Sequence, residues 1–163
     1  MTGVTAEFYP FLLQTIGATQ RTERDLARMF DEICELNLEA ERKGTRHVMI
    51  STNRNGLSAT ERKLIVKLSK EALAKPHKAM ICCYAILPDA LARGGLTALK
   101  WLLPALETTV GVATPEKAIE LACGLLTRSG VPFNPVHARL AIRRLNLECA
   151  TVDIPPSARS VRS

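Results

Sequence analysis

Residues 79–87 read Ala-Met-Ile-Cys-Cys-Tyr-Ala-Ile-Leu, which is the longest uninterrupted apolar run in the chain. The run does not alternate between apolar and polar residues, so a strand built from it would be apolar on both faces. Such a strand is typical of a parallel sheet that is covered by helices on both sides. Its nine residues are also far fewer than a membrane-spanning helix needs. The stretch therefore predicts an α/β fold without a membrane span.

Two amphipathic helices are predicted before this run. Thr22 precedes Glu23 and Asp25, which suits a helix start. From Leu26 onward, apolar residues recur at helical spacing until Lys43-Gly44, a cation and a glycine that suit a helix end. A second helix is predicted to begin at Ser58, because Glu61 follows it at the spacing of a capping box, and to end before Pro76.

The rest of residues 1–130 continues the same alternation of strands and helices. We predict about four mostly parallel strands that alternate with four helices, since helical crossovers between apolar strands imply parallel pairing. Gly94-Gly95 is expected either to interrupt the third helix or to allow a close approach of the backbone. The other strands are predicted over residues 8–16, 47–51 and 109–113, and the other helices over residues 88–104 and 114–130.

The pattern changes after Gly130. Residues 131–135 read like a linker, residues 135–147 are only loosely periodic, and the end of the chain is rich in proline, serine and arginine. We therefore expect an α/β domain over residues 1–130 and a basic C-terminal extension over residues 131–163, with a helix at 135–147 and a disordered tail.

Composition narrows the classes of protein. The 163 residues suit one domain, and 47% of them are hydrophobic, which is enough for a core. The net charge is +6, yet acidic residues are spread evenly over the body, which argues against a nucleic-acid-binding domain. The five cysteines form no CxxC pair and suit reduced, buried thiols. Glu7 precedes the first apolar run without a basic region, so a signal peptide is not expected and we predict a cytoplasmic protein.

The residues that most often carry chemistry form no recognisable set. His47, His77 and His137 are far apart and have no companion at the spacing of metal ligands. We expect the first two at strand entrances near water. Cys82 and Cys83 lie in the middle of an apolar strand, which favours inert core thiols over a nucleophile. No phosphate-binding glycine loop or nucleophile elbow is present. The sequence predicts no catalytic residue, metal or cofactor.

Candidate binding residues follow the strand ends. Asn53, Arg54 and Asn55 follow the strand at 47–51, and loops beyond the carboxyl ends of parallel strands are where ligands usually bind. The same residues are also ordinary turn formers. Arg93 is either a solvated arginine or an anion contact. Trp101 lies on a helix that is apolar nearly all round, so it is either buried or part of a patch for another protein or a second copy.

Several of these stretches together resemble a known fold family. Residues 85–88 (Ala-Ile-Leu-Pro), residues 93–98 (Arg-Gly-Gly-Leu-Thr-Ala) and Trp101-Leu102 resemble a segment of small uncharacterised bacterial proteins with the STAS-like fold of anti-sigma-factor antagonists. The helix start at residues 114–118 and the strand, polar loop and helix from residue 47 fit the same proteins. The resemblance extends over residues 8–126, and only its 93–101 stretch is specific.

The resemblance implies a non-enzymatic regulatory module that binds a partner through the loop and helix after residues 47–51. In the antagonists this loop carries an Asp-Ser-Ser-Gly motif, whose serine a partner kinase phosphorylates. Here residues 53–58 read Asn-Arg-Asn-Gly-Leu-Ser, so the motif is absent. Ser58 is the nearest hydroxyl and already has a structural role in its capping box. A phosphoserine switch is therefore not expected.

The leading hypothesis is a STAS-like adaptor that binds a partner protein without turnover. Its binding residues would be Asn53, Arg54, Asn55 and Ser58, with Arg93 and Trp101 nearby, and self-association through the Trp101 helix is a further prediction. The basic C-terminal segment would link the adaptor to a larger assembly. The alternative is a small-molecule or anion-binding domain that uses the strand-end loops. An enzyme is not expected, because no nucleophile, base or metal set converges.

Overall fold

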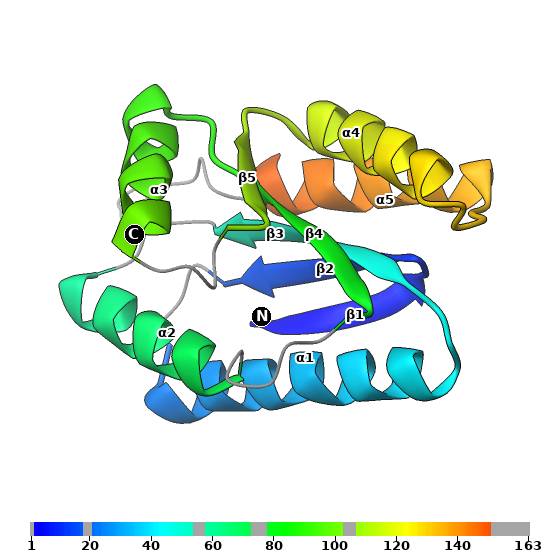
Figure 1. The fold of residues 1–163 in the computed structure, drawn as a ribbon. Coiled ribbons are helices and arrows are strands. Elements are labelled where there is room, and N and C mark those ends of the chain that lie inside the picture. The colour runs from blue at the N-terminus through cyan, green and yellow to red at the C-terminus, as the bar shows by residue number, and fades with distance from the viewer. Residues whose placement is uncertain (1, 18–20, 54–57, 73–77, 103–106, 151–163) are drawn as a thin grey trace, which may run out of the picture.

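A computed structural model describes residues 2–17, 21–53, 58–72, 78–102 and 107–150. The described chain forms an α/β structure with one five-stranded sheet and helices on both of its faces (Figure 1). In chain order the elements are β1 (Gly3–Phe8), β2 (Phe11–Ile16), α1 (Glu23–Arg42), β3 (His47–Asn53), α2 (Ala59–Ala72), β4 (Met80–Ile86), α3 (Ala90–Leu102), β5 (Thr109–Val112), α4 (Pro115–Arg128) and α5 (Pro135–Ala150).

The strands lie in the sheet in the same order as in the sequence, β1-β2-β3-β4-β5. β2, β3, β4 and β5 are parallel, as predicted, and the apolar run at 79–87 forms β4, which has a partner on each side. The single strand expected at residues 8–16 is wrong. The chain turns at Tyr9-Pro10, and β1 pairs antiparallel with β2 as a hairpin. Pro10 has no backbone N–H to give to a ladder, which favours a turn there.

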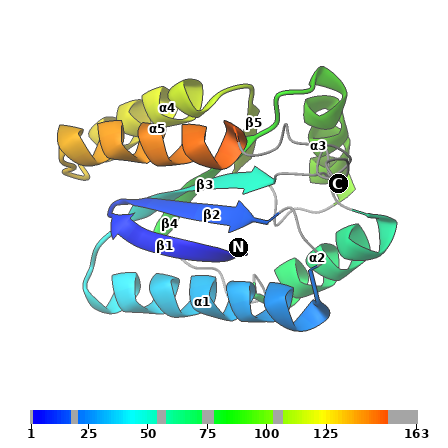
Figure 2. The same ribbon diagram turned by 180° about the vertical axis from the view of Figure 1, so that it is seen from behind.

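Helices cover both faces of the sheet. α1 and α2 lie on one face, and α4 and α5 lie side by side on the other (Figures 1 and 2). Because the side chains of β3 alternate, Val48 and Ile50 belong to the core beneath α4 and α5, and Met49 belongs to the core beneath α1. The prediction of a sheet buried on both faces is confirmed.

Both predicted ends of the first helix and the predicted start of the second are confirmed, and the end expected before Pro76 lies next to residues 73–77, which are outside the description. Thr22 caps α1 and forms a capping box with Asp25, and Ser58 and Glu61 form the box that begins α2. α1 ends at Lys43, followed by Gly44 in the left-handed region at φ +64°.

α3 differs from its prediction. The helix runs without interruption from Ala90 to Leu102, through Gly94 and Gly95. Both glycines are exposed, and a helix tolerates each of them at about 1 kcal/mol relative to alanine. A different glycine allows the close approach in this region. A Cβ at Gly111 in β5 would lie 3.3 Å from Leu96 Cδ2, so α3 can pack on this strand because Gly111 has no side chain.

The segment after Gly130 belongs to the same core as the preceding residues. α5 runs along α4 and contacts β1, β2 and β3. Its side chains Ala138, Ala141 and Leu145 are buried in the core cluster that contains Val48 and Ile50. The helix expected at 135–147 is present, but the boundary expected at 130 does not separate two packing units. The small alanine side chains allow the helix to lie close to the sheet. The expected tail at 151–163 lies outside the described residues.

None of the helices in the described ranges combines the length and the hydropathy that crossing a membrane requires.

The position of α5 in the core predicts unequal effects for two leucines of the same helix. Leu145→Ala should lower the free energy of unfolding by about 2–5 kcal/mol, because Leu145 is fully buried. Leu147→Ala should lower it by less than about 0.5 kcal/mol, because Leu147 is exposed. Urea denaturation of both variants measures this. Equal, small effects would mean that α5 is a detachable appendage.

Candidate functional site

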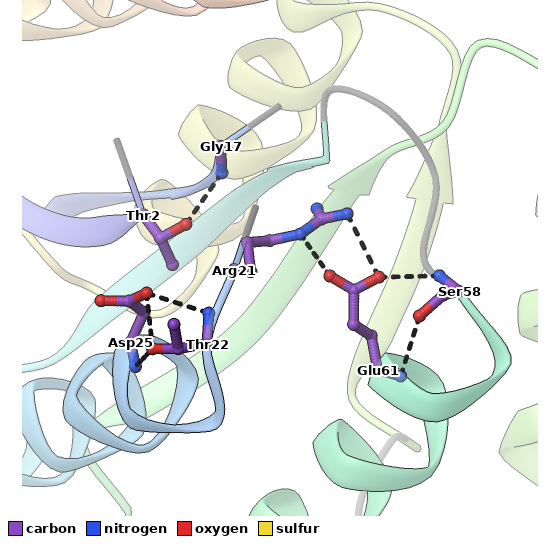
Figure 3. A network of polar contacts seen from close by, with 7 residues as sticks. All are labelled: Thr2, Gly17, Arg21, Thr22, Asp25, Ser58 and Glu61. Atoms are coloured by element: carbon purple, nitrogen blue, oxygen red, sulfur yellow. Dashed lines mark hydrogen bonds and ion pairs between the residues drawn. The ribbon is translucent and has the colours of Figure 1, made fainter. Parts of the chain in front are cut away.

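The carboxyl ends of the four parallel strands meet at one edge of the sheet, and the helices that follow them begin there. Two of these helix starts, those of α1 and α2, are joined by a network of polar contacts (Figure 3). The network brings together the segment after β2 and the segment after β3, two strands that are neighbours in the sheet. It is therefore placed where an open parallel sheet usually binds its ligands.

Arg21 and Glu61 form the centre of this network. Arg21 Nε donates to Glu61 Oε1 at 2.6 Å, and a terminal guanidinium nitrogen donates to Oε2 at 3.3 Å (Figure 3). The side chains of Arg21 and Glu61 are only 8% and 17% exposed. Glu61 Oε2 also accepts the backbone N–H of Ser58 at 2.8 Å, and Ser58 Oγ accepts the Glu61 N–H at 3.2 Å. One carboxylate thus caps α2 and binds the arginine that precedes α1.

The start of α1 is closed in the same way. Thr22 follows Arg21 directly, and its backbone N–H and hydroxyl donate to Asp25 Oδ2 at 3.0 and 2.8 Å. The Asp25 N–H donates back to the Thr22 hydroxyl at 3.1 Å. Arg21 therefore links two capping boxes, and the first turns of α1 and α2 are fixed relative to each other.

The carboxylates of this network are ionised. The backbone N–H and hydroxyl of Ser58, and then Arg21, hold the pKa of Glu61 below its ordinary value. The N–H and hydroxyl of Thr22 do the same for the pKa of Asp25. Each helix start thus already holds a negative charge, which is what its partial positive charge favours. At these two helix starts, carboxylates of the chain itself already occupy the place that an anion would take.

The structure places the predicted site residues unequally. Ser58 is exposed and belongs to the network described above. Asn53 is the last residue of β3, where its backbone pairs with Ile16, but its side chain lies outside the described part of the chain. Arg54 and Asn55 lie wholly outside the described residues.

The two predicted residues near α3 do not join the network. Arg93 is half-buried, and one guanidinium nitrogen donates to the carbonyl oxygens of Leu87 and Pro88, each at 2.7 Å. Arg93 therefore holds the turn between β4 and α3, a structural role that its sequence context did not indicate. No hydrogen bond or ion pair joins it to Ser58 within the described ranges. Trp101 lies in α3, and its side chain is outside the description.

Arg21 was not among the predicted residues. No local pattern marks it, since an arginine before a helix cap is common. Two features taken together could have identified Arg21, however. The caps Thr22 and Ser58 each follow the end of a parallel strand, and neighbouring strands bring such ends together. An arginine directly before one cap is then within reach of the capping carboxylate of the other, Glu61.

The cysteines in β4 are not poised for nucleophilic chemistry. Cys82 and Cys83 are both buried, as predicted, and burial raises the pKa of Cys83 to about 12. Burial also raises the pKa of Cys82, whose Sγ donates to the carbonyl oxygen of Thr108 at 2.9 Å. The described residues contain no group of three or more histidine, cysteine or acidic side chains that could hold a metal ion.

His47 differs from its prediction. It stands at the entrance of β3, but it is fully buried and not near water. The Tyr9 ring packs edge-on against it, with 6.1 Å between ring centroids, and neither imidazole nitrogen has a hydrogen-bond partner among the residues that the structure describes. Desolvation lowers the pKa of His47 from 6.5 to about 4. His47 is therefore a neutral core side chain at neutral pH.

The opposite, amino-terminal edge of the sheet has an open depression near the end of α1 and the starts of β3 and β4. It contains no residue that the sequence singled out for binding. Its lining mixes acidic, basic and small residues, namely Glu41, Gly44, Thr45, Arg46, Lys78 and Ala79.

The buried position of the Arg21–Glu61 pair predicts a measurable coupling. In a double-mutant cycle of Arg21→Ala and Glu61→Gln, the coupling should be about 1–2 kcal/mol, and glutamine keeps the capping acceptor. The coupling should be present at neutral pH and be lost once the pH falls below the ordinary glutamate pKa of 4.5 and through the lowered pKa of Glu61 in the folded chain, because the carboxylate is then protonated. The exposed pair Glu39–Lys43 is the matched control and should couple far less. Equal coupling in both pairs would contradict a central role for Arg21.

The burial of His47 predicts acid sensitivity at a different pH. Between pH 6.5 and pH 4 the unfolded chain binds a proton on His47 and the folded chain does not, so stability should fall as the pH is lowered. The loss should be on the order of 2–3 kcal/mol. Urea unfolding at several pH values should show this slope in the wild type and a smaller slope in His47→Leu. An unchanged slope in the variant would place the titrating group elsewhere.

Comparison with known proteins gives no relative from which a role could be carried over. No model of a protein family, no curated protein and no solved structure matches the chain.

Proposed function

We propose that this protein is a non-enzymatic interaction module of STAS-like type that binds a partner protein at the carboxyl edge of its sheet, around the first turns of α2. The observation that carries the proposal is the nearly buried Arg21–Glu61 ion pair, which also engages Ser58. It fixes the start of α2 against the segment that precedes α1.

This arrangement leaves the outward side of α2 available. Ser58, Thr60 and Lys63 are exposed, while Glu61 between them points to Arg21. A binding surface on a preorganised helix end loses little conformational entropy when a partner docks. Charged side chains such as Lys63 favour a partner surface with acidic groups. The rigid backbone and exposed side chains together suit recognition of another protein.

The alternative of an anion-binding domain is less well supported. Anion sites at helix starts need free backbone N–H groups and a net positive field. At α1 and α2 the carboxylates of Asp25 and Glu61 occupy this position, and Glu61 also neutralises Arg21. An incoming anion would have to displace a carboxylate of the chain itself.

The absence of turnover is part of the proposal. Burial raises the pKa of both cysteines in β4 and keeps His47 neutral, so none of the three is an activated nucleophile or a base within reach of solvent. The STAS-like type, the regulatory role, the cytoplasmic location and self-association are supported only by the sequence features described above.

Added negative charge at the first turns of α2 tests the proposal. The tagged full-length chain should copurify a specific protein from the cells in which it occurs naturally. Lys63→Glu and Thr60→Glu should each reduce the amount of that protein at least about tenfold, because each places negative charge on the exposed edge that is proposed to meet an acidic partner surface. Quantitative mass spectrometry of the purified fractions measures this.

Lys70→Glu is the matched control, because Lys70 is exposed in the last turn of the same helix, away from the carboxyl edge. This variant should retain the partner, and all three variants should unfold at the wild-type urea concentration. Loss of the partner from Lys70→Glu as well, its retention by both edge variants, or the absence of any reproducible partner would each overturn the proposal.

A further inference from the structure

α5 presents a row of exposed apolar side chains on its outer face. Val136, Leu140 and Leu147 are 45%, 39% and 66% exposed. Arg143, which is also exposed, lies between Leu140 and Leu147 in the same row. The four positions are separated by four, three and four residues. This alternation of three and four is the spacing at which one helix receives the side chains of another along a shared seam.

The row is exposed even though α5 is firmly attached to the rest of the fold. On a helix with 3.6 residues per turn, it lies opposite the buried stripe of Ala138, Ala141 and Leu145. Asn146 Nδ2 donates to Glu116 Oε1 of α4 at 2.6 Å and thereby fixes the rotation of α5. The fold thus packs one side of α5 into the core and holds the other side toward solvent. The second apolar side also explains why the periodicity of residues 135–147 is weak.

The charged side chains within the row and directly beside it are arginines. Arg139 and Arg144 lie on its two sides, and Arg143 lies within it. Arg144 Nε contacts Glu148 Oε1 at 3.1 Å, and Glu148 is the acidic residue of α5. Arg139 and Arg143 form no ion pair with any residue that the structure describes. The outer face of α5 therefore combines an apolar seam with unneutralised guanidinium groups.

We propose that the outer face of α5 docks an acidic amphipathic helix of a partner protein. The apolar residues of that helix would pack along Val136, Leu140 and Leu147, and its aspartates or glutamates would pair with Arg139 and Arg143. Carboxylates and guanidinium groups form two parallel hydrogen bonds, which favours an acidic partner over a merely polar one.

Other occupants fit this face less well. A second copy would bring its own arginines against Arg139 and Arg143, and like charges at a contact are unfavourable. The end of this chain, residues 151–163, carries Asp153 but also Arg159 and Arg162, so its net charge has the wrong sign. An anionic membrane would match the charge. However, the row has no aromatic side chain, and the opposite side of α5 is packed on the sheet, so little apolar area could enter a bilayer.

This surface is independent of the proposed function. α5 lies on the opposite face of the sheet from α2 (Figures 1 and 2), and none of its residues belongs to the Arg21–Glu61 network. A partner on α5 and a partner at the carboxyl edge would therefore contact different helices. The two proposals can fail separately.

A designed peptide tests the inference directly. The probe is a synthetic fluorescent peptide of about four helical turns, with leucines at alternating spacings of three and four and glutamates beside them. Fluorescence anisotropy should show saturable binding to the full-length protein, weakened by added salt. A peptide with lysine in place of each glutamate, and a scrambled peptide of the same composition, should each bind at least about tenfold more weakly.

Variants of the protein locate the binding. Arg143→Glu and Leu147→Asp should each weaken binding of the acidic peptide at least about tenfold, and both residues are exposed, so folding should be retained. Arg24→Glu, an equal change of charge at an exposed position of α1, and Lys63→Glu at the carboxyl edge should leave binding unchanged. These two controls separate this surface from general electrostatics and from the proposed function.

Three outcomes would overturn the inference. The first is that the acidic peptide does not bind, or binds no better than the lysine peptide. The second is that Arg143→Glu and Leu147→Asp bind like the wild type. The third is that the protein does not bind the peptide but sediments with vesicles of phosphatidylcholine and phosphatidylserine, and that Leu147→Asp abolishes this sedimentation. That result would mean that the face binds a membrane.

Discussion

The structure depends on a sheet whose central strands are apolar on both faces. In β3, Val48 and Ile50 enter one core, and Met49 enters the other. In β4, Cys82 and Tyr84 face one core, and Cys83 faces the other. Exposing either apolar face to water would be unfavourable, so the fold requires a layer of helices on each side of the sheet. The two layers are built from different parts of the chain.

The strand order determines which helices can supply each layer. The parallel strands β2 to β5 follow one another in sequence order, and right-handed crossovers between such strands place their helices on the same face. α1 and α2 lie together on that face. Gly111, where α3 packs, alternates with Val112 of the other core and so belongs to the α1 face too. The second face must then be covered by the chain after β5. α4 alone is one helix beside a five-stranded sheet, and α5 completes the layer over β1 and β2. The segment after residue 130 is therefore required by the topology.

This topology explains which parts of the structure could be predicted from the sequence. Local sequence signals were sufficient to predict where α1 and α2 begin, because the caps at Thr22 and Ser58 involve residues close in the chain. The apolar run at 79–87 was sufficient for β4. The turn at Tyr9-Pro10 was missed because the apolar stretch at 8–16 continues from the last residue of β1 through the turn into β2. The role of α5 was missed because its periodicity reflects two apolar sides, and only the tertiary arrangement shows which one is buried.

The candidate site was harder to predict, for a related reason. Ser58 was identified by its local pattern, but the side chain that gives the edge its rigidity is Arg21, which is forty positions from Glu61 in the sequence. The pairing of β2 with β3 brings the two residues together, and no periodicity within either segment records that pairing. Arg93 makes a structural contact that its local sequence did not indicate. An arginine beside two glycines suggested an exposed group, whereas its guanidinium binds the carbonyl oxygens of Leu87 and Pro88.

The same topology separates the two surfaces on which partners are proposed. The first turns of α2 stand at the carboxyl edge of the sheet, where α1 and α2 are clamped by Arg21. The outer side of α5 stands on the other layer, clamped to α4 by Asn146 and Glu116. Each surface is an exposed helix side whose backbone is held by a polar contact with a neighbouring helix. Because the sheet lies between them, one partner can dock on each surface without steric conflict between the two sets of contact residues. An adaptor needs such an arrangement, and a single-site binding domain does not.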